Sequence, residues 1–89
     1  MGPRAKLKWE TRFTVPVHLL AEQDIRTLAG KIKAEVKASG GGWRLRVLSV
    51  DPTAMNRRVN MFTVGLARRC KKLGKEMPRL ELTERSVRE

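Results

Sequence analysis

Apolar and polar side chains alternate along residues 7–17, the first patterned stretch of the chain. The apolar parity holds Leu7, Trp9, Phe13, Val15 and Val17, and the polar parity holds Lys8, Glu10, Arg12 and Thr14. A period of two predicts a β-strand with one face on the core and the other toward solvent. Pro16 lacks a backbone donor, so its place near the end of this stretch predicts an edge strand.

From His18 to about Ser39 the apolar period changes to that of an α-helix. Six apolar side chains gather within about 100° of a helical wheel: Ala21, Ile25, Leu28, Ala29, Ile32 and Val36. The glycines at 40–42 predict the helix end, because glycine adopts the left-handed conformation that is common there. Residues 43–50 then predict a second strand, and apolar side chains on both of its parities indicate a central position in the sheet.

A second amphipathic helix is predicted over residues 51–74. Asp51 supplies an N-cap, Pro52 suits the first helical turn, and Gly74 supplies a stop. The apolar positions fall within about 80° of one another: Met55, Val59, Phe62, Leu66, Cys70 and Leu73. A competing interpretation makes residues 58–66 a strand paired with the preceding one, since this segment contains several residues that favour strands.

The end of the chain is predicted to add a short strand around Leu80 and Leu82, after Pro78. Residues 83–89 then form a polar tail, and residues 84–89 are expected to fray. This third strand completes the elements that the pattern predicts.

The 89 residues are predicted to form one small basic domain, an α+β two-layer sandwich. Its order is strand, helix, strand, helix, strand, with both helices on one face of a small sheet and the other face open. If residues 58–66 were a strand, the order would become β-α-β-β-α-β, the ferredoxin-like arrangement, which is also a two-layer sandwich. With so small a core, a homodimer is a further way to bury apolar surface.

The charge of the chain indicates what kind of partner to expect. Its 20 Lys and Arg outnumber its 9 Asp and Glu, for a net charge of +11. Residues 51–74 carry six cations against one carboxylate, all six off the apolar stripe: Arg57, Arg58, Arg68, Arg69, Lys71 and Lys72. The two arginine pairs are nearly three helical turns apart, which aligns them in two rows with about 16 Å between row members. Such rows are suited to the phosphates of nucleic acid.

The second strand offers further candidates for the same role. Arg44 and Arg46 share one parity with no carboxylate between them, which predicts an open basic sheet face. Trp43 is a candidate for base stacking, although core packing is the commoner role of a strand aromatic. We therefore expect a non-catalytic nucleic-acid-binding protein, for DNA or RNA, that contacts the phosphate backbone with low sequence specificity.

Two other functions remain open on the sequence. The first is a small adaptor or regulatory subunit that docks on an acidic protein partner, with charge steering association and Met61 and Val64 anchoring it. The second is a small ribonuclease of the toxin type, in which Arg and Lys stabilise developing phosphate charge. The isolation of His18 and the absence of tyrosine weigh against the ribonuclease.

Enzymatic chemistry, cofactors and metals are not expected. No combination of nucleophile, base and orienting acid is apparent, and the single cysteine, Cys70, excludes an internal disulfide and a paired-cysteine zinc site. No apolar run approaches about 18 residues, so no membrane partner is expected. A cytoplasmic location is the expectation that follows.

Residues 47–69 resemble the middle of the Alba family of small basic nucleic-acid-binding proteins. Ala54, Met55 and Val59 stand where that family carries an Ala-Ile-x-x-x-Val pattern at the start of its second helix. The resemblance implies a strand-helix-strand-helix core and nucleic-acid binding. The sequence departs from the family at Asp51-Pro52-Thr53, where the family has Arg-Gly, and it has no counterpart of the family's final β-hairpin after Leu82.

Overall fold

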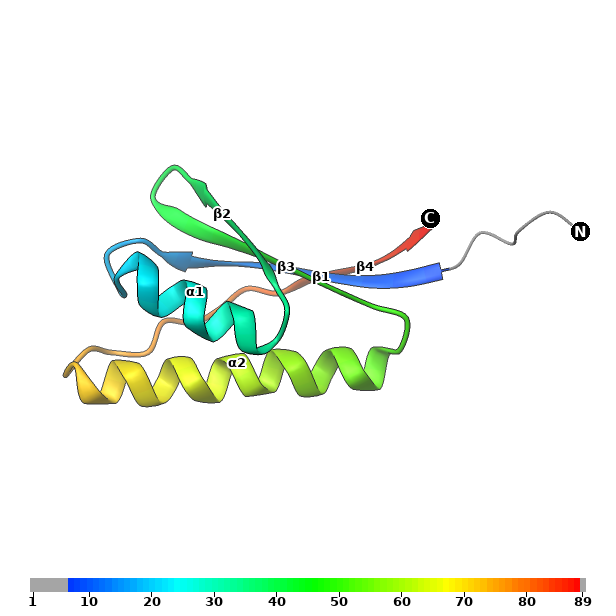
Figure 1. The fold of residues 1–89 in the computed structure, drawn as a ribbon. Helices are drawn as coiled ribbons and strands as arrows, with labels where there is room; N and C mark the ends of the chain where they lie inside the picture. The colour runs from blue at the N-terminus through cyan, green and yellow to red at the C-terminus, as the bar shows by residue number, and fades with distance from the viewer. Residues whose placement is uncertain (1–6, 89) are drawn as a thin grey trace, which may run out of the picture.

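The computed structural model describes residues 7–88, which form a two-layer α+β sandwich (Figure 1). The elements in chain order are β1 (Leu7–Pro16), α1 (Glu22–Lys31), β2 (Glu35–Ser39), β3 (Gly42–Ser49), α2 (Pro52–Lys72) and β4 (Thr83–Arg88). The sheet has the order β2-β3-β1-β4, and all neighbouring strands are antiparallel. Both helices cover one face of the sheet, which confirms the predicted fold class. The element order is that of the ferredoxin-like alternative.

The hairpin of this arrangement is not where the alternative placed it. Residues 58–66 are helical, and the extra strand is β2, which lies within the helix predicted for residues 18–39. Ser39 pairs with Gly42, and Gly40 takes a positive φ of 56° in the turn between them. The glycines at 40–42 therefore form a hairpin turn and the start of β3, and the prediction that they end a helix was wrong.

Helix α1 ends early because its C-terminus closes with a Schellman motif. The amide of Ala34 donates to the carbonyl of Ala29, and the amide of Lys33 donates to that of Gly30. Lys33 occupies the position normally held by glycine, with a φ of 53°. No glycine or proline marks this site, so the helical period of the sequence runs past it, and Val36, which shares that period, lies in a strand.

Replacing Lys33 with glycine is expected to raise the free energy of unfolding by about 0.5–1 kcal/mol, because glycine adopts this backbone conformation without the Cβ clash. Thermal or urea unfolding measures the effect. Lys31→Gly is the matched control: it lies two residues earlier, within the helix, and should destabilise. A loss of stability in Lys33→Gly as large as that of the control would contradict the assignment.

Helix α2 follows the sequence prediction closely. The carboxylate of Asp51 accepts a hydrogen bond from the amide of Thr53 at 3.0 Å, and Pro52 is the first helical residue. Gly74 follows the helix with a φ of 68°. The predicted stripe is buried at Met55, Val59, Phe62, Leu66 and Cys70. Leu73, at the end of the same stripe, is half exposed and is the C-cap residue that follows the helix.

Strand β4 differs from the predicted C-terminus. It pairs with residues 7–12 of β1, so residues 84–88 form a strand where a frayed tail was expected. Residue 89 lies outside the described residues. Leu80 and Leu82 precede β4 rather than forming it. Because β4 reaches only to residue 12 of β1, the edge position predicted from Pro16 is correct for the last residues of β1 and wrong for the first six.

The core lies between the helices and the inner face of the sheet. Phe13 of β1 packs against Phe62 of α2 with ring centroids 5.1 Å apart, and Leu45 and Val47 of β3 are fully buried beside them. Within residues 7–88, neither helix has both the length and the apolar character that crossing a membrane requires. The opposite face of the sheet is left uncovered by helices.

Candidate nucleic-acid interface

Strand register brings basic side chains together on the uncovered face of the sheet. Arg12 of β1 lies opposite Arg46 of β3, and Arg44 lies opposite Lys37 of β2. Cross-strand neighbours of like charge repel one another. The pairing of Arg12 with Arg46 therefore needs a nearby anion.

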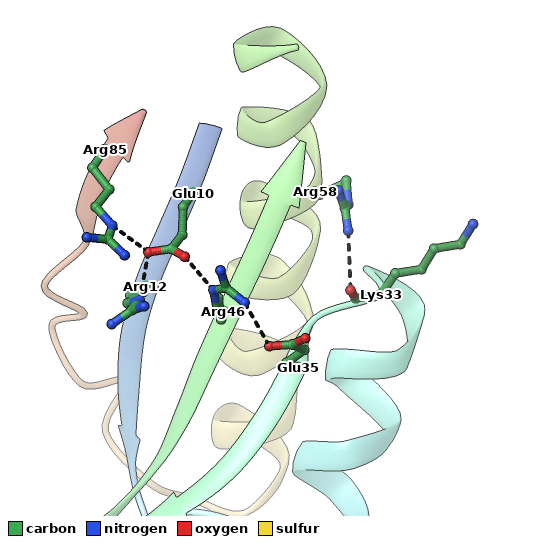
Figure 2. A network of polar contacts seen from close by, with 7 residues as sticks. All are labelled: Glu10, Arg12, Lys33, Glu35, Arg46, Arg58 and Arg85. Atoms are coloured by element: carbon green, nitrogen blue, oxygen red, sulfur yellow. Dashed lines mark hydrogen bonds and ion pairs between the residues drawn. The ribbon is translucent and has the colours of Figure 1, made fainter. Parts of the chain in front are cut away.

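That anion is Glu10, whose carboxylate lies at the centre of a cluster of arginines (Figure 2). Arg12 Nε is 2.7 Å and Arg85 Nε is 2.9 Å from Oε1, while Arg46 Nε donates to Oε2. Arg46 also reaches Glu35 of β2, with 3.3 Å between Nη1 and Oε2. One carboxylate thus joins β1, β3 and β4 through three guanidinium groups.

Glu10 is only 1% exposed although it lies on the uncovered face, because the arginines themselves cover it. Burial alone would raise the pKa of its carboxyl group, but hydrogen bonds from Arg46, Arg85 and Arg12 outweigh that cost and lower the pKa from 4.5 to about 2. The hydrogen bond to Glu10 in turn raises the pKa of Arg46. The cluster is therefore fully ionised at neutral pH. The three guanidinium groups and the carboxylate of Glu10 together carry a net charge of +2.

A hollow of about 840 Å³ lies beside this cluster on the same face. Its charged lining consists of five cations and two carboxylates: Arg12, Lys37, Arg44, Arg46, Arg79, Glu35 and Glu81. The side chains of Lys37, Arg44 and Arg79 make no hydrogen bond or ion pair with any other residue of the described range 7–88. The hollow therefore has a positive excess, with three cations available to a ligand.

Arg44 and Arg46 thus lie where the sequence placed them, on an open basic sheet face. Trp43 does not lie there. Its ring is 7% exposed and packs in the core between the sheet and the helices, so no ring face is available for base stacking. Its indole Nε1 is buried without a hydrogen-bond partner among the described residues. The base-stacking prediction is wrong, and the commoner core role of a strand aromatic applies.

The arginines of the two rows predicted on α2 do not share one environment. Arg58 points toward the end of α1 rather than into solvent, and its guanidinium group donates to three backbone carbonyls. Its Nε is 2.9 Å from the oxygen of Ile32, and its Nη1 is 2.7 Å from that of Leu48. Arg58 is thus a structural residue that joins α2 to the end of α1 and to β3. Its assignment to a nucleic-acid contact was wrong.

The other basic residues of α2 have more solvent contact. Arg69 lies 3.7 Å from Asp24 of α1, in a partly exposed ion pair. Arg57, Arg68, Lys71 and Lys72 are exposed. Arg57 and Arg68 lie on the side of α2 opposite its buried stripe, whereas Arg44 and Arg46 lie on the sheet face that the helices do not cover. The predicted site residues therefore belong to two separate surfaces.

Sequence reasoning missed seven charged residues of the sheet face: Glu10, Arg12, Glu35, Lys37, Arg79, Glu81 and Arg85. A signal existed for the first two, since Glu10 and Arg12 occupy the polar parity of the alternating stretch that became β1. Lys37 falls within the helix that the sequence predicts from His18 to about Ser39, and Arg85 falls within the predicted polar tail. Their position on the face depends on β2 and β4, which the pattern did not reveal.

Comparisons with known proteins add little to this geometry. No family model matches the chain, and no curated protein matches it. Among solved structures, the chain is similar to the de novo designed protein Foldit4, with 20% sequence identity, a TM-score of 0.44, and coverage of 91% of this chain and 94% of that one. A likeness at this level carries no argument about function. The resemblance to the Alba family stays a prediction.

Proposed function

We propose that this protein is a non-catalytic nucleic-acid-binding protein that contacts the phosphate backbone through the uncovered face of its sheet. The observation that carries the proposal is the hollow on that face, where five cations outnumber two carboxylates. Lys and Arg side chains that neutralise phosphates release counterions from the nucleic acid, which favours binding. A cytoplasmic location and binding of either DNA or RNA are parts of the same proposal.

Low sequence specificity follows from the side chains that the face lacks. Trp9, Phe13 and Trp43 share the parity that faces the helices, so among residues 7–88 no strand aromatic lies on the basic face. Stacking of bases on aromatic rings is therefore not expected there. Arginine and lysine contacts to phosphates position a nucleic acid without reading its sequence.

The cluster around Glu10 supports the proposal by holding guanidinium groups in place. Arg12, Arg46 and Arg85 use Nε to reach the carboxylate, and the side chains of Arg12 and Arg85 remain half exposed. Arginines that are already ordered lose less conformational entropy on binding a phosphate than free ones.

Salt titration of binding to a short DNA duplex and to a single-stranded RNA tests the proposal. A variant with Lys37, Arg44 and Arg79 all changed to Gln is expected to weaken binding and to reduce the slope of log K against log salt by about 2–3. Within the described range their side chains make no hydrogen bond or ion pair, and glutamine keeps most of their aliphatic length, so the variant should remain folded. Circular dichroism and thermal unfolding check this.

The matched control changes Arg57, Arg68 and Lys72 of α2 to Gln, which removes the same charge from the other side of the molecule. Its salt slope should stay close to that of the unchanged protein. Equal slopes for the two variants would mean that only net charge matters. That outcome, or an unaltered slope in the sheet variant, would refute the proposal.

A further inference from the structure

A groove on the outer side of the helix layer has a composition unlike that of the sheet face. It lies between α1 and α2, has a volume of about 340 Å³, and is lined by Leu28, Lys31, Arg57, Asn60, Met61, Val64, Gly65 and Arg68. It faces away from the sheet. The proposed phosphate-binding surface therefore does not include it.

The floor of the groove is apolar and accessible. Met61 is 55% exposed and Val64 is 50% exposed, both large values for apolar residues of a helix that packs on a sheet. Gly65 leaves room for the side chain of Leu28 from α1 at this point, since a Cβ built there would lie 2.8 Å from Cδ2 of Leu28.

Three cations surround the apolar floor of the groove. Arg57 and Arg68 lie on either side of Met61 and Val64 along α2, about 16 Å apart by helical rise. Lys31 lies across the groove on α1. No carboxylate is among the described residues that line it.

The positive charge around the groove indicates which kind of partner can occupy it. A second copy of this chain would bring the same cations to the same groove, and like charges repel. A nucleic acid would place phosphates against Met61 and Val64, with no aromatic ring among the described lining residues on which to stack a base. A helix with apolar residues along one stripe and carboxylates beside them would pack its apolar side on the floor of the groove and pair its carboxylates with the surrounding cations.

We propose that the groove between α1 and α2 docks an acidic amphipathic helix of a partner protein. Apolar side chains of the partner cover Met61 and Val64, and its carboxylates pair with Arg57, Arg68 and Lys31. This site is independent of the sheet face, so the protein has separate surfaces for a polyanion and for an acidic helix.

The test uses a synthetic 16-residue peptide with leucines at helical spacing on one face and glutamates on the other. A peptide of identical composition with the leucines scattered serves as the reference. Fluorescence anisotropy should show binding of the first peptide at least about tenfold tighter than binding of the second. Amide signals of Met61, Val64 and Gly65 should shift in heteronuclear NMR spectra.

Variants assign the peptide site. Met61→Ser combined with Val64→Ser should weaken peptide binding about tenfold, while leaving nucleic-acid binding and the salt slope unchanged. The variant with Lys37, Arg44 and Arg79 changed to Gln should bind the peptide as tightly as the unchanged protein. Equal binding of the two peptides, no loss in the Met61 and Val64 variant, or loss of nucleic-acid binding in that variant would overturn the proposal.

Discussion

Replacing Arg58 with methionine is expected to lower the free energy of unfolding by about 2–3 kcal/mol. The guanidinium group of Arg58 bonds the carbonyls of Ile32 and Leu48, and it also contacts that of Lys33 at 3.4 Å. Methionine keeps most of the aliphatic packing but donates no hydrogen bond. The carbonyls that end α1 and β3 then lose their charged donor.

The effect should be visible as a fall of roughly 10 °C or more in the melting temperature, for a domain of this size. Arg57→Met is the matched control, because Arg57 is the adjacent arginine of α2 and is exposed. It should change the free energy of unfolding by less than about 0.5 kcal/mol. Arg58→Lys should recover only part of the loss, since one ammonium group does not reproduce the fork of a guanidinium. Equal stability of the two methionine variants would contradict the structural role.

Glu10→Gln is expected to lower the free energy of unfolding by about 1–2 kcal/mol at neutral pH. The carboxylate offsets repulsion among Arg12, Arg46 and Arg85, and its loss leaves three adjacent cations without their common anion. The estimate is held to this range because two of the arginines are half exposed, so that solvent screens their charges. Urea unfolding at several salt concentrations measures the effect, and added salt should reduce the difference.

The same carboxylate gives the stability a defined dependence on pH. The pKa of Glu10 is about 2 in the folded protein, below the ordinary value of 4.5, so its stabilising contribution is complete above 4.5. It is lost as the pH falls from 4.5 toward about 2, because the unfolded chain takes up the proton first.

Subtracting the urea-unfolding curves of Glu10→Gln from those of the unchanged protein isolates this contribution. The difference should be largest near neutral pH, should shrink as the pH falls from 4.5, and should disappear only below about 2. Glu22→Gln is the control, since Glu22 forms an exposed ion pair with Arg26 on α1. It should show a much smaller difference. A difference for Glu10 that does not vary with pH would contradict the ionised cluster.

The sequence predicts elements best where the pattern and the caps agree. Helix α2 has an N-cap at Asp51, a stop at Gly74 and one continuous stripe, and the structure places it within two residues of the prediction. Helix α1 lacks such a stop, because Lys33 ends it in a conformation that favours glycine. The apolar spacing of residues 18–39 therefore predicts one long helix and gives no sign of strand β2.

The candidate site shows the same limit for charged residues. The helical wheel predicts the side of α2 on which Arg57 and Arg68 lie, but it does not predict the contacts of the Arg58 side chain. Arg58 is drawn to carbonyls of Ile32 and Leu48, which are 26 and 10 residues away in the chain. Local periodicity contains no information about contacts at that separation.

The basic face of the sheet required the full topology. Arg85 meets Glu10 across 75 residues of sequence, through a strand whose composition is that of a polar tail. An edge strand with both faces in contact with solvent needs no apolar alternation, so its sequence carries no strand signal. The charge of the chain predicted a polyanion partner, whereas the position of the surface came from the strand register.

The most direct test of the proposed function is NMR of the arginine side chains during titration with a short DNA duplex and, separately, a single-stranded RNA at low salt. The Nε–Hε signals of Arg12, Arg44 and Arg85 should shift, and should return to their starting positions as salt is added. Those of Arg57 and Arg68 should move far less. Shifts confined to Arg57 and Arg68, or no shift of any arginine with either nucleic acid, would contradict binding at the sheet face.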